Sequence, residues 1–314
     1  MTVSQRIVNW LHQCRRQATE DAVGGLLHIS RRLSPERILS LGRGIGWLAN
    51  WPLQLRLAAN LRAAGITPTA AIVDRYFQIM GNWAGWSLAV YQRGFAGSGI
   101  GRRIHLDSSV RHLDEARARG KGVLLAAAHF FCHEMGAAAI NLRHPIVALV
   151  RESKDHARQE IKDRWYRATG MEVVRRSRQA SLMSDTLAYL RVLRTNKVLA
   201  ITPDLPMPDD KGVPVCILGR DVVLPSGLIA LSLRSGAPLV PCWGEWLPDR
   251  QGRPHEGLIR FDAPLEFASA GNREAIIHTG VQEYAGRFED YLRRFPENWM
   301  FWLDKRWTRV WRRV

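Results

Sequence analysis

The sequence predicts an α/β protein in which a central, mostly parallel sheet is flanked by helices and preceded by a helical, membrane-associating region. Two observations predict this fold class. From about residue 103, short apolar runs alternate with segments of helical periodicity. Several apolar runs are continuous rather than alternating, which is typical of parallel strands that are buried on both faces. We therefore expect a helical region at 1–95 and an α/β domain at 96–314.

The first 95 residues are predicted to be helical. Ser34 and Pro35 form the start signature of a long helix, and a second helical stretch follows from Thr67. Leucine, isoleucine and tryptophan mix with arginine along the first helix, as in an interfacial amphipathic helix, although core packing explains the same stripe. Arg43 interrupts the most apolar stretch, and the first 25 residues lack an apolar signal core. The sequence therefore predicts neither a spanning helix nor a secretory signal.

The α/β domain is predicted to consist of strands and helices that alternate in chain order. Strands are expected at 103–107, 121–129, 145–151, 171–176, 197–204 and 237–246. Helices are expected at 108–120, 130–143, 154–170, 181–196 and 226–236. The last segment, 289–314, concentrates tryptophan and arginine, which is typical of a tail that binds a membrane interface.

The charge and the tryptophan content narrow the class of partner. The chain has 45 Lys and Arg against 29 Asp and Glu, a formal net charge of +16, and 12 tryptophans. Such a basic protein is expected to bind nucleic acid, an acidic membrane surface or a phosphorylated substrate. Tryptophan favours the membrane interface, and a merely basic, soluble surface is the alternative. The four cysteines form no CxxC pair, which indicates a reducing compartment.

One short stretch, AAAHFFCHEMGAAAI at 126–140, carries the densest chemistry, and three interpretations compete. A metal site would use His129 and His133, but the order H-F-F-C-H-E matches neither zinc-protease pattern and no third ligand is evident. An acid–base pair would place His129 at the carboxyl end of a strand, with Glu134 reaching back to its Nδ1 and Nε2 free as a general base. Two histidines satisfied structurally at a strand–helix junction are the third interpretation.

Several motifs, taken together and in order, resemble one enzyme family. A histidine, four residues and an acid after an apolar strand is the hallmark of the glycerolipid and lysophospholipid acyltransferases. The other motifs are similar to the branch that contains the lipid A late (lauroyl/myristoyl) acyltransferases and the phosphatidylinositol mannoside acyltransferases. The segments that carry this resemblance, between residues 33 and 310, are LGRGIGWLANWPLQLRLAANL, VRESKDHARQEIKDRWYRATGMEVVRR, ITPDLP, ILGRDVVLPSGLIALSLRSGAPLVP and FPENWMFWLDKRW.

The resemblance implies catalytic roles for specific side chains. His129 would deprotonate an acceptor hydroxyl, Glu134 would orient the imidazole, and His133 is expected to be structural. Arg167, or else Arg164, is expected to be the basic residue that stabilises the oxyanion. These two arginines are three residues apart on one predicted helix, so a solvated helix face explains them equally well.

The resemblance also implies an acidic strand end and a set of binding residues. Asp204 takes the place of the family's strand-end acid, although a turn-forming aspartate before Pro206 explains it as well. Contacts to phosphate on the acceptor are expected from Arg151, Lys154 and Arg176. A loop near the acyl-donor channel is expected from Gly219, Pro225, Ser226 and Gly227, although an ordinary turn explains these four as well. In this set, Ser226 is also the N-cap expected just ahead of a helix.

The partners implied by the resemblance are an acyl thioester and a lipid. A fatty acyl chain would pass directly from acyl-carrier protein or acyl-coenzyme A to a hydroxyl of a (glyco)lipid such as a lipid A precursor, without metal, cofactor or acyl-enzyme. The implied location is the cytoplasmic face of a bacterial inner membrane, on its anionic surface.

Departures from the family pattern and proteins of other classes leave alternatives. The closing motif has Asp304 and Lys305 where the family usually has histidine and arginine, and the loop at 206–215 also departs from the pattern. The acceptor can therefore instead be a lysophospholipid, a phosphatidylinositol mannoside or an aminolipid. A metal-dependent hydrolase and a nucleic-acid-binding protein are the alternatives from other classes, but no helix-turn-helix, zinc-finger or RNP signature is present.

Overall fold

The computed structural model describes residues 21–176, 182–208, 211–268 and 271–312. Its centre is a seven-stranded sheet in the order β1-β9-β8-β2-β5-β3-β4. All neighbouring strands are parallel except β8 and β9, which are antiparallel. The mostly parallel α/β architecture predicted from the alternating apolar runs is confirmed.

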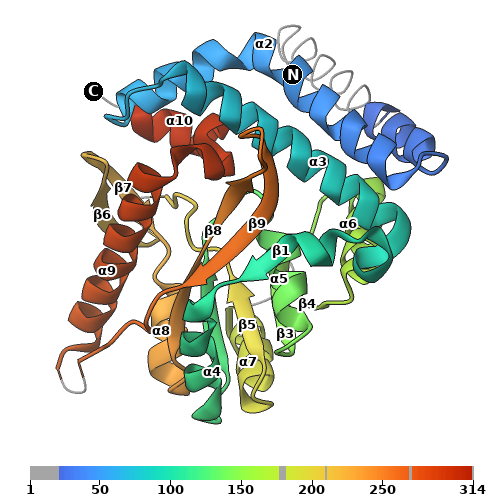
Figure 1. Ribbon diagram of the computed structural model, residues 1–314. Coiled ribbons are helices and arrows are strands. Elements are labelled where there is room, and N and C mark those ends of the chain that lie inside the picture. The colour runs from blue at the N-terminus through green and yellow to red at the C-terminus, as the bar shows by residue number, and fades with distance from the viewer. Residues whose placement is uncertain (1–20, 177–181, 209–210, 269–270, 313–314) are drawn as a thin grey trace, which may run out of the picture.

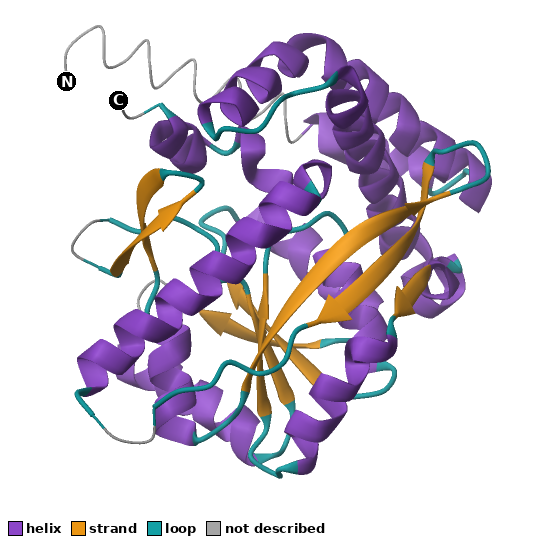
Figure 2. Cartoon of the chain, turned by 60° about the vertical axis from the view of Figure 1, so that its left-hand side comes forward, coloured by secondary structure: helices purple, strands orange, loops and turns teal. Residues whose placement is uncertain are grey.

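The strands of the sheet, except the last, follow the predicted order along the chain. They are β1 (Ile104–Leu106), β2 (Val123–Ala127), β3 (Ile146–Arg151), β4 (Glu172–Arg176), β5 (Val198–Ile201), β8 (Leu239–Pro248) and β9 (Pro254–Phe261). The helices of this domain are α4 (Arg111–Ala118), α5 (His133–Asn141), α6 (His156–Thr169), α7 (Leu182–Arg194), α8 (Gly227–Ser235), α9 (Arg273–Arg294) and α10 (Lys305–Trp311). Helices lie on both sides of the sheet, as the crossovers of a parallel sheet require (Figure 2).

Some elements were not expected from the sequence. These are strand β9, helices α9 and α10, and a separate antiparallel hairpin of β6 (Val213–Ile217) and β7 (Arg220–Leu224). The hairpin turn consists of Leu218 and Gly219, both with positive φ (52° and 70°), as a tight two-residue hairpin needs.

Two long antiparallel helices, α2 (Pro35–Ala63) and α3 (Ala70–Ser98), form a hairpin beside the sheet domain (Figure 1). Ser34 caps α2 by accepting from the Arg37 amide, with Pro35 in the first turn, as predicted. The two helices meet through glycines, and a Cβ on Gly42 would lie 2.4 Å from the Gly85 Cα. Residues 21–30 are also helical, while 1–20 lie outside the described residues.

One face of α2 carries exposed apolar side chains. The most exposed are Trp47, Leu48, Trp51 and Leu55, which are between 65% and 82% accessible to solvent. Within the described parts of the chain, no helix has both the length and the apolarity needed to cross a membrane.

The C-terminal segment is part of the core, so the prediction of an interface-binding tail was wrong. Trp299, Trp302, Trp307 and Trp311 are at most 1% exposed and form a chain of edge-on and stacked rings. An indole ring is apolar except for one N–H group that donates a hydrogen bond, which suits it to a membrane interface. The same properties suit it to a protein core in which a hydrogen-bond acceptor is available for that N–H group. The composition of this segment therefore could not distinguish the two environments.

Candidate active site

The candidate site forms where two neighbouring strands end. Strands β2 and β5 pair in parallel, so the segments that follow Ala127 and Ile201 emerge at the same edge of the sheet. After β2 the chain turns through Cys132, which has a left-handed φ of 72°, and enters α5 at His133. The C-terminal segment holds this turn through a backbone hydrogen bond, in which the Met300 amide donates to the His129 carbonyl oxygen at 3.0 Å.

His129 is paired with Asp204 across this edge of the sheet. The Nδ1 atom of His129 lies 2.6 Å from Oδ1 of Asp204, and the His129 backbone amide donates to Oδ2 at 2.8 Å. Oδ2 also accepts from the Trp299 indole at 2.8 Å, and the Trp307 indole donates to the Asp204 backbone carbonyl at 2.9 Å. The carboxylate is thus fixed in position by three different groups.

The electrostatics of the pair define the tautomer of His129. Asp204 is fully buried, and burial alone would raise the pKa of its carboxyl group. The neighbouring His129 and the hydrogen bonds from His129 and Trp299 outweigh burial and lower this pKa below its ordinary value. Asp204 is therefore ionised and accepts a hydrogen bond from the proton on Nδ1, which leaves Nε2 of the neutral ring with a free lone pair.

The expected hydrogen bond from His129 Nδ1 to the Glu134 carboxylate was wrong, since Nδ1 is paired with Asp204. Glu134 lies in the first turn of α5, and its Oε1 accepts from the Tyr166 hydroxyl at 3.4 Å. The physical reason is the sheet. The loop after β2 turns the imidazole toward the end of β5, a neighbour in space that is 75 residues away along the chain.

His133 makes the contacts of a structural histidine. Its Nδ1 lies 2.9 Å from the Phe130 carbonyl oxygen, and its ring contacts His129 edge-on at 5.2 Å between centroids. Burial lowers the pKa of His133 below its ordinary value, so the ring is neutral near pH 7. Among the residues with described positions, no three His, Cys, Asp or Glu side chains come together as a metal site would require.

His129 lines a cavity of about 820 Å³, to whose wall helices α5 and α8 both contribute residues. Most of its wall is apolar and comes from strands and helices of the sheet domain: Leu125, Ala127, Ala137, Ile140, Ala148, Leu149, Ala200, Ile201, Leu228, Leu231 and Ile259. Charged side chains also line it: Glu134, Arg151, Lys162, Arg176, Asp185, Arg234, Arg273 and Arg306. The arrangement suits an amphiphile with a hydrocarbon part and an anionic part.

The predicted binding residues divide into two groups. Arg151, Arg176, Pro225 and Gly227 line the cavity, while Lys154, Gly219 and Ser226 do not. Lys154 is exposed, and Gly219 lies in the turn of the β6–β7 hairpin. Ser226 stands directly before α8, as predicted, but its side chain makes no capping hydrogen bond.

The two arginines expected to stabilise an oxyanion point elsewhere, so that placement was wrong. The Arg164 guanidinium lies 4.5 Å from the centre of the Tyr91 ring on α3, and Arg167 is exposed. Helix α6 instead presents Lys162 and Tyr166 to the cavity. These are four residues apart and share one face, whereas positions 164 and 167 face other directions.

Lys162 was missed by the sequence analysis. Burial lowers its pKa, while the negative charge of Glu134 opposes that change. Its Nζ donates to the Arg151 backbone carbonyl at 2.6 Å. The signal that could have identified it is the position of Lys162 one helical turn before Tyr166. Phe301, whose ring centre lies 4.4 Å from that of His129, carried no such signal because its approach depends on the C-terminal fold.

The family model for bacterial lipid A biosynthesis acyltransferases matches residues 68–309. This match includes α3, the whole sheet, both residues of the His129–Asp204 pair and every residue that lines the cavity. No curated protein matches the chain.

Proposed function

Because the chain belongs to the bacterial lipid A biosynthesis acyltransferases, we propose that it moves a fatty acyl chain from an acyl-carrier protein or coenzyme A thioester to a hydroxyl of a (glyco)lipid such as a lipid A precursor. The observation that carries this proposal is the His129–Asp204 pair in the wall of a largely apolar cavity. The pair can supply a base, and the cavity can hold a hydrocarbon chain beside it.

In the proposed reaction, His129 acts as general base and then as general acid. Nε2 takes the proton of the acceptor hydroxyl while its oxygen attacks the thioester carbonyl carbon. The tetrahedral intermediate collapses, the C–S bond breaks, and the leaving thiolate takes the proton from the imidazolium. Asp204 does not contact the substrate; it holds the tautomer of His129 and stabilises the imidazolium through the 2.6 Å contact with Nδ1.

The developing oxyanion needs positive charge, and we propose Lys162 for this role. Its ammonium group lines the same cavity as His129, in a setting that is partly removed from water. Glu134 lines the cavity too, and its charge favours the protonated form of Lys162. Glu134 thus acts through Lys162 in this proposal, and not through His129.

Charged residues of the cavity suit the anionic parts of the two substrates. Arg151 on β3 and Arg176 on β4 are opposite each other in the strand register, and both line the cavity. Guanidinium groups bind phosphate oxygens well, and the phosphopantetheine of the donor and many lipid headgroups carry phosphate. The apolar wall would receive the acyl chain.

The exposed face of α2 is the proposed contact with the bilayer. Trp47, Leu48, Trp51 and Leu55 fall within an arc of about 100° around the helix, since successive residues are rotated by about 100°. Tryptophan and leucine on one exposed helix face are typical of a helix that lies in the lipid–water interface. We propose that this face, rather than the C-terminal segment, places the enzyme at the membrane.

An acceptor-dependence assay tests direct transfer. Purified protein is mixed with acyl-carrier-protein thioester, and the release of free thiol is followed with and without a lipid acceptor fraction. Direct transfer requires thiol release only when acceptor is present, with no labelled acyl group retained on the protein. A burst of thiol in the absence of acceptor would instead indicate an acyl-enzyme and contradict the proposed mechanism.

A further inference from the structure

A second cavity of about 730 Å³ lies between the α2–α3 hairpin and the turn that joins β8 to β9. It shares no lining residue with the cavity of His129. The residues that line it are Glu36, Leu39, Ser40, Arg43, Trp47, Asn50, Asp74, Phe77, Gln78, Asn82, Trp86, Arg103, Asp249, Arg253, Pro254 and His255. Nothing in the proposed acyl transfer uses this cavity.

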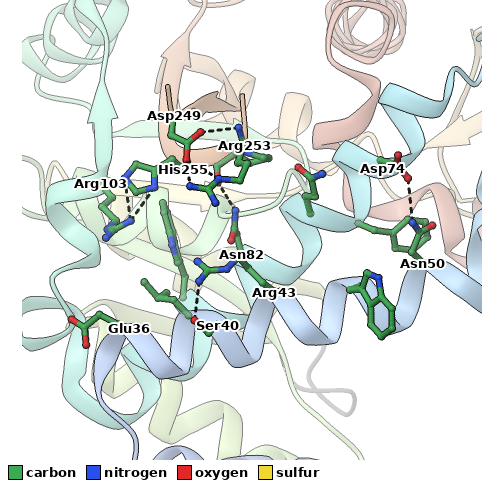
Figure 3. A pocket seen from close by; sticks show the side chains of 16 residues that line it. Glu36, Ser40, Arg43, Asn50, Asp74, Asn82, Arg103, Asp249, Arg253 and His255 are labelled. Atoms are coloured by element: carbon green, nitrogen blue, oxygen red, sulfur yellow. Dashed lines mark hydrogen bonds and ion pairs between the residues drawn. The ribbon is translucent and has the colours of Figure 1, made fainter. Parts of the chain in front are cut away.

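Basic side chains gather at one end of it. Arg43 from α2 lies across from Arg103, Arg253 and His255, which come from the opposite wall (Figure 3). Arg43 donates to the Ser40 hydroxyl at 2.8 Å, and Arg103 lies 3.3 Å from the His255 ring nitrogens. Among the described residues, neither Arg43 nor Arg103 has a carboxylate within ion-pair distance. Two guanidinium groups are therefore available to an anion.

The acidic residues of the cavity do not neutralise this end. Asp249 already accepts hydrogen bonds from the Arg253 guanidinium and from two backbone amides of its own turn. Asp74 lies at the other end, where it accepts from the Asn50 side chain at 3.2 Å (Figure 3). Glu36, in the first turn of α2, is exposed and forms no ion pair with Arg43 or Arg103 among the described residues. Its pKa is lowered first by a hydrogen bond from its backbone and only to a lesser degree by the charge of Arg103.

The other end of the cavity offers partners for hydroxyl groups. The amide oxygen of Asn50 is buried and accepts no hydrogen bond from the described residues. A buried acceptor without a donor costs free energy, and a ligand hydroxyl can supply the missing hydrogen bond. Asp74 and Gln78 line the cavity beside it.

The geometry points to a binding site for the phosphate ester of a polyol, and we propose that the ligand is the headgroup of an anionic bilayer lipid. The phosphate would lie between Arg43 and Arg103, where guanidinium forks match its oxygens, and the polyol would extend toward Asn50. Trp47 lines the cavity and also belongs to the exposed apolar face of α2, so the lipid chains would continue along that face. That the ligand is a bilayer lipid rests on the proposed membrane face of α2. That the cavity binds a phosphate ester does not depend on that face.

The test compares two double variants of the full chain that lose the same charge. Arg43→Gln with Arg103→Gln removes the two guanidinium groups between which the phosphate would lie. The matched control, Arg119→Gln with Arg194→Gln, removes two exposed arginines at the far edge of the sheet domain, near the ends of α4 and α7 (Figure 1). Binding is measured to vesicles of equal parts phosphatidylglycerol and phosphatidylcholine, to vesicles of phosphatidylcholine alone, and to glycerol 1-phosphate in solution.

We expect the cavity variant to lose affinity for the phosphatidylglycerol vesicles on the order of thirtyfold, because each basic residue at such a surface contributes about 1 kcal/mol and 1.4 kcal/mol is tenfold. The control should lose much less, and binding to phosphatidylcholine should be the same for both. Loss of glycerol 1-phosphate binding in the cavity variant would also support a phosphate-ester site and would identify a soluble ligand as its source.

Equal losses in the two double variants would overturn the proposal, since they would reflect general charge alone. Wild-type protein that binds neither phosphatidylglycerol vesicles nor glycerol 1-phosphate would overturn it too. Acyl transfer to a detergent-dispersed acceptor should be unchanged in the cavity variant. Failure of this inference is therefore distinguishable from failure of the proposed function.

Discussion

The imidazole of His129 and the carboxylate of Asp204 lie 2.6 Å apart at the ends of two neighbouring parallel strands, and neither partner is free to turn away. The His129 amide and the Trp299 indole both donate to the second carboxylate oxygen. Asp204 is thereby held as a buried anion that faces Nδ1. This relationship leaves Nε2 as the one basic atom of the pair that can meet a substrate hydroxyl.

Replacing Asp204 by Asn should lower kcat by roughly 10³- to 10⁴-fold, because an amide can stabilise the wrong imidazole tautomer while the shape is kept. NMR provides a direct readout of the proton on Nδ1. The resonance of that proton should be lost in Asp204→Asn and retained in Glu134→Gln. If Glu134→Gln removes the resonance and Asp204→Asn does not, then Glu134 is the orienting acid.

The stability of the fold should depend on pH through His133. Burial lowers its pKa in the folded state, so below its ordinary value of about 6.5 the unfolded chain binds the additional proton. Stability should therefore fall as pH decreases from 7 through the folded-state pKa, by at most about 1.4 kcal/mol per pH unit for this group. His144 is also buried and has a lowered pKa, so the wild-type slope contains both histidines.

Comparison of the wild type with His133→Asn isolates the contribution of His133. Urea unfolding is measured for both proteins between pH 7 and about pH 5, the window below the ordinary histidine pKa. The variant should be less stable at pH 7, but its stability should change less with pH. Parallel curves for the two proteins would show that His133 is not titrating in the folded state as described.

Exposed and buried tryptophans should respond differently to substitution. Trp47→Ser with Trp51→Ser should weaken binding to lipid vesicles by roughly a hundredfold or more, because each side chain would bury apolar area worth about 1.5–3 kcal/mol. Its melting temperature should stay close to that of the wild type, since both side chains are exposed. The fully buried Trp302 provides the contrast: Trp302→Ala should destabilise the fold by about 3–5 kcal/mol. Unchanged vesicle binding in the double variant would contradict the proposed membrane face.

The close approach of α2 and α3 should be sensitive to a single methyl group. A Cβ at position 42 would lie 2.4 Å from backbone atoms of Gly85, so Gly42→Ala should force the helices apart and cost about 1–3 kcal/mol or more. Gly44→Ala on the same helix is the control, because beyond its chain neighbours and the backbone of its own helix nothing lies within 4 Å of the added Cβ. It should stabilise the helix by about 0.5–1 kcal/mol. Thermal unfolding that moves in the same direction for both variants would contradict this packing.

The α/β core was predictable because its signal is local. The segments of β2, β3, β5 and β8 are short, continuous apolar runs separated by helical segments. This pattern indicates parallel strands that are buried on both faces of the sheet. The β6–β7 hairpin was missed because Pro214 lies within β6, and a proline inside a short apolar run argues against a strand.

The site was predictable in its residues but not in its contacts. Both His129 and Asp204 stand out at strand ends, yet strand order decides which residues meet, and one chain does not reveal strand order. Proximity along the chain favoured Glu134, and the sheet placed Asp204 there instead. In the same way, aromatic–basic composition could not separate the buried Trp299 from the exposed Trp51, because burial is set by distant segments.

The central claim, that His129 is the base of a lipid acyltransferase, is tested most directly by the lipid profile of a strain that lacks the gene. The strain is complemented with the wild type, with His129→Ala or with Arg119→Gln as an expressed control. We expect one lipid class to lose a single acyl chain in the deletion strain, and to regain it with the wild type and the control but not with His129→Ala. An unchanged lipid profile on deletion, or full restoration by His129→Ala, would contradict the account.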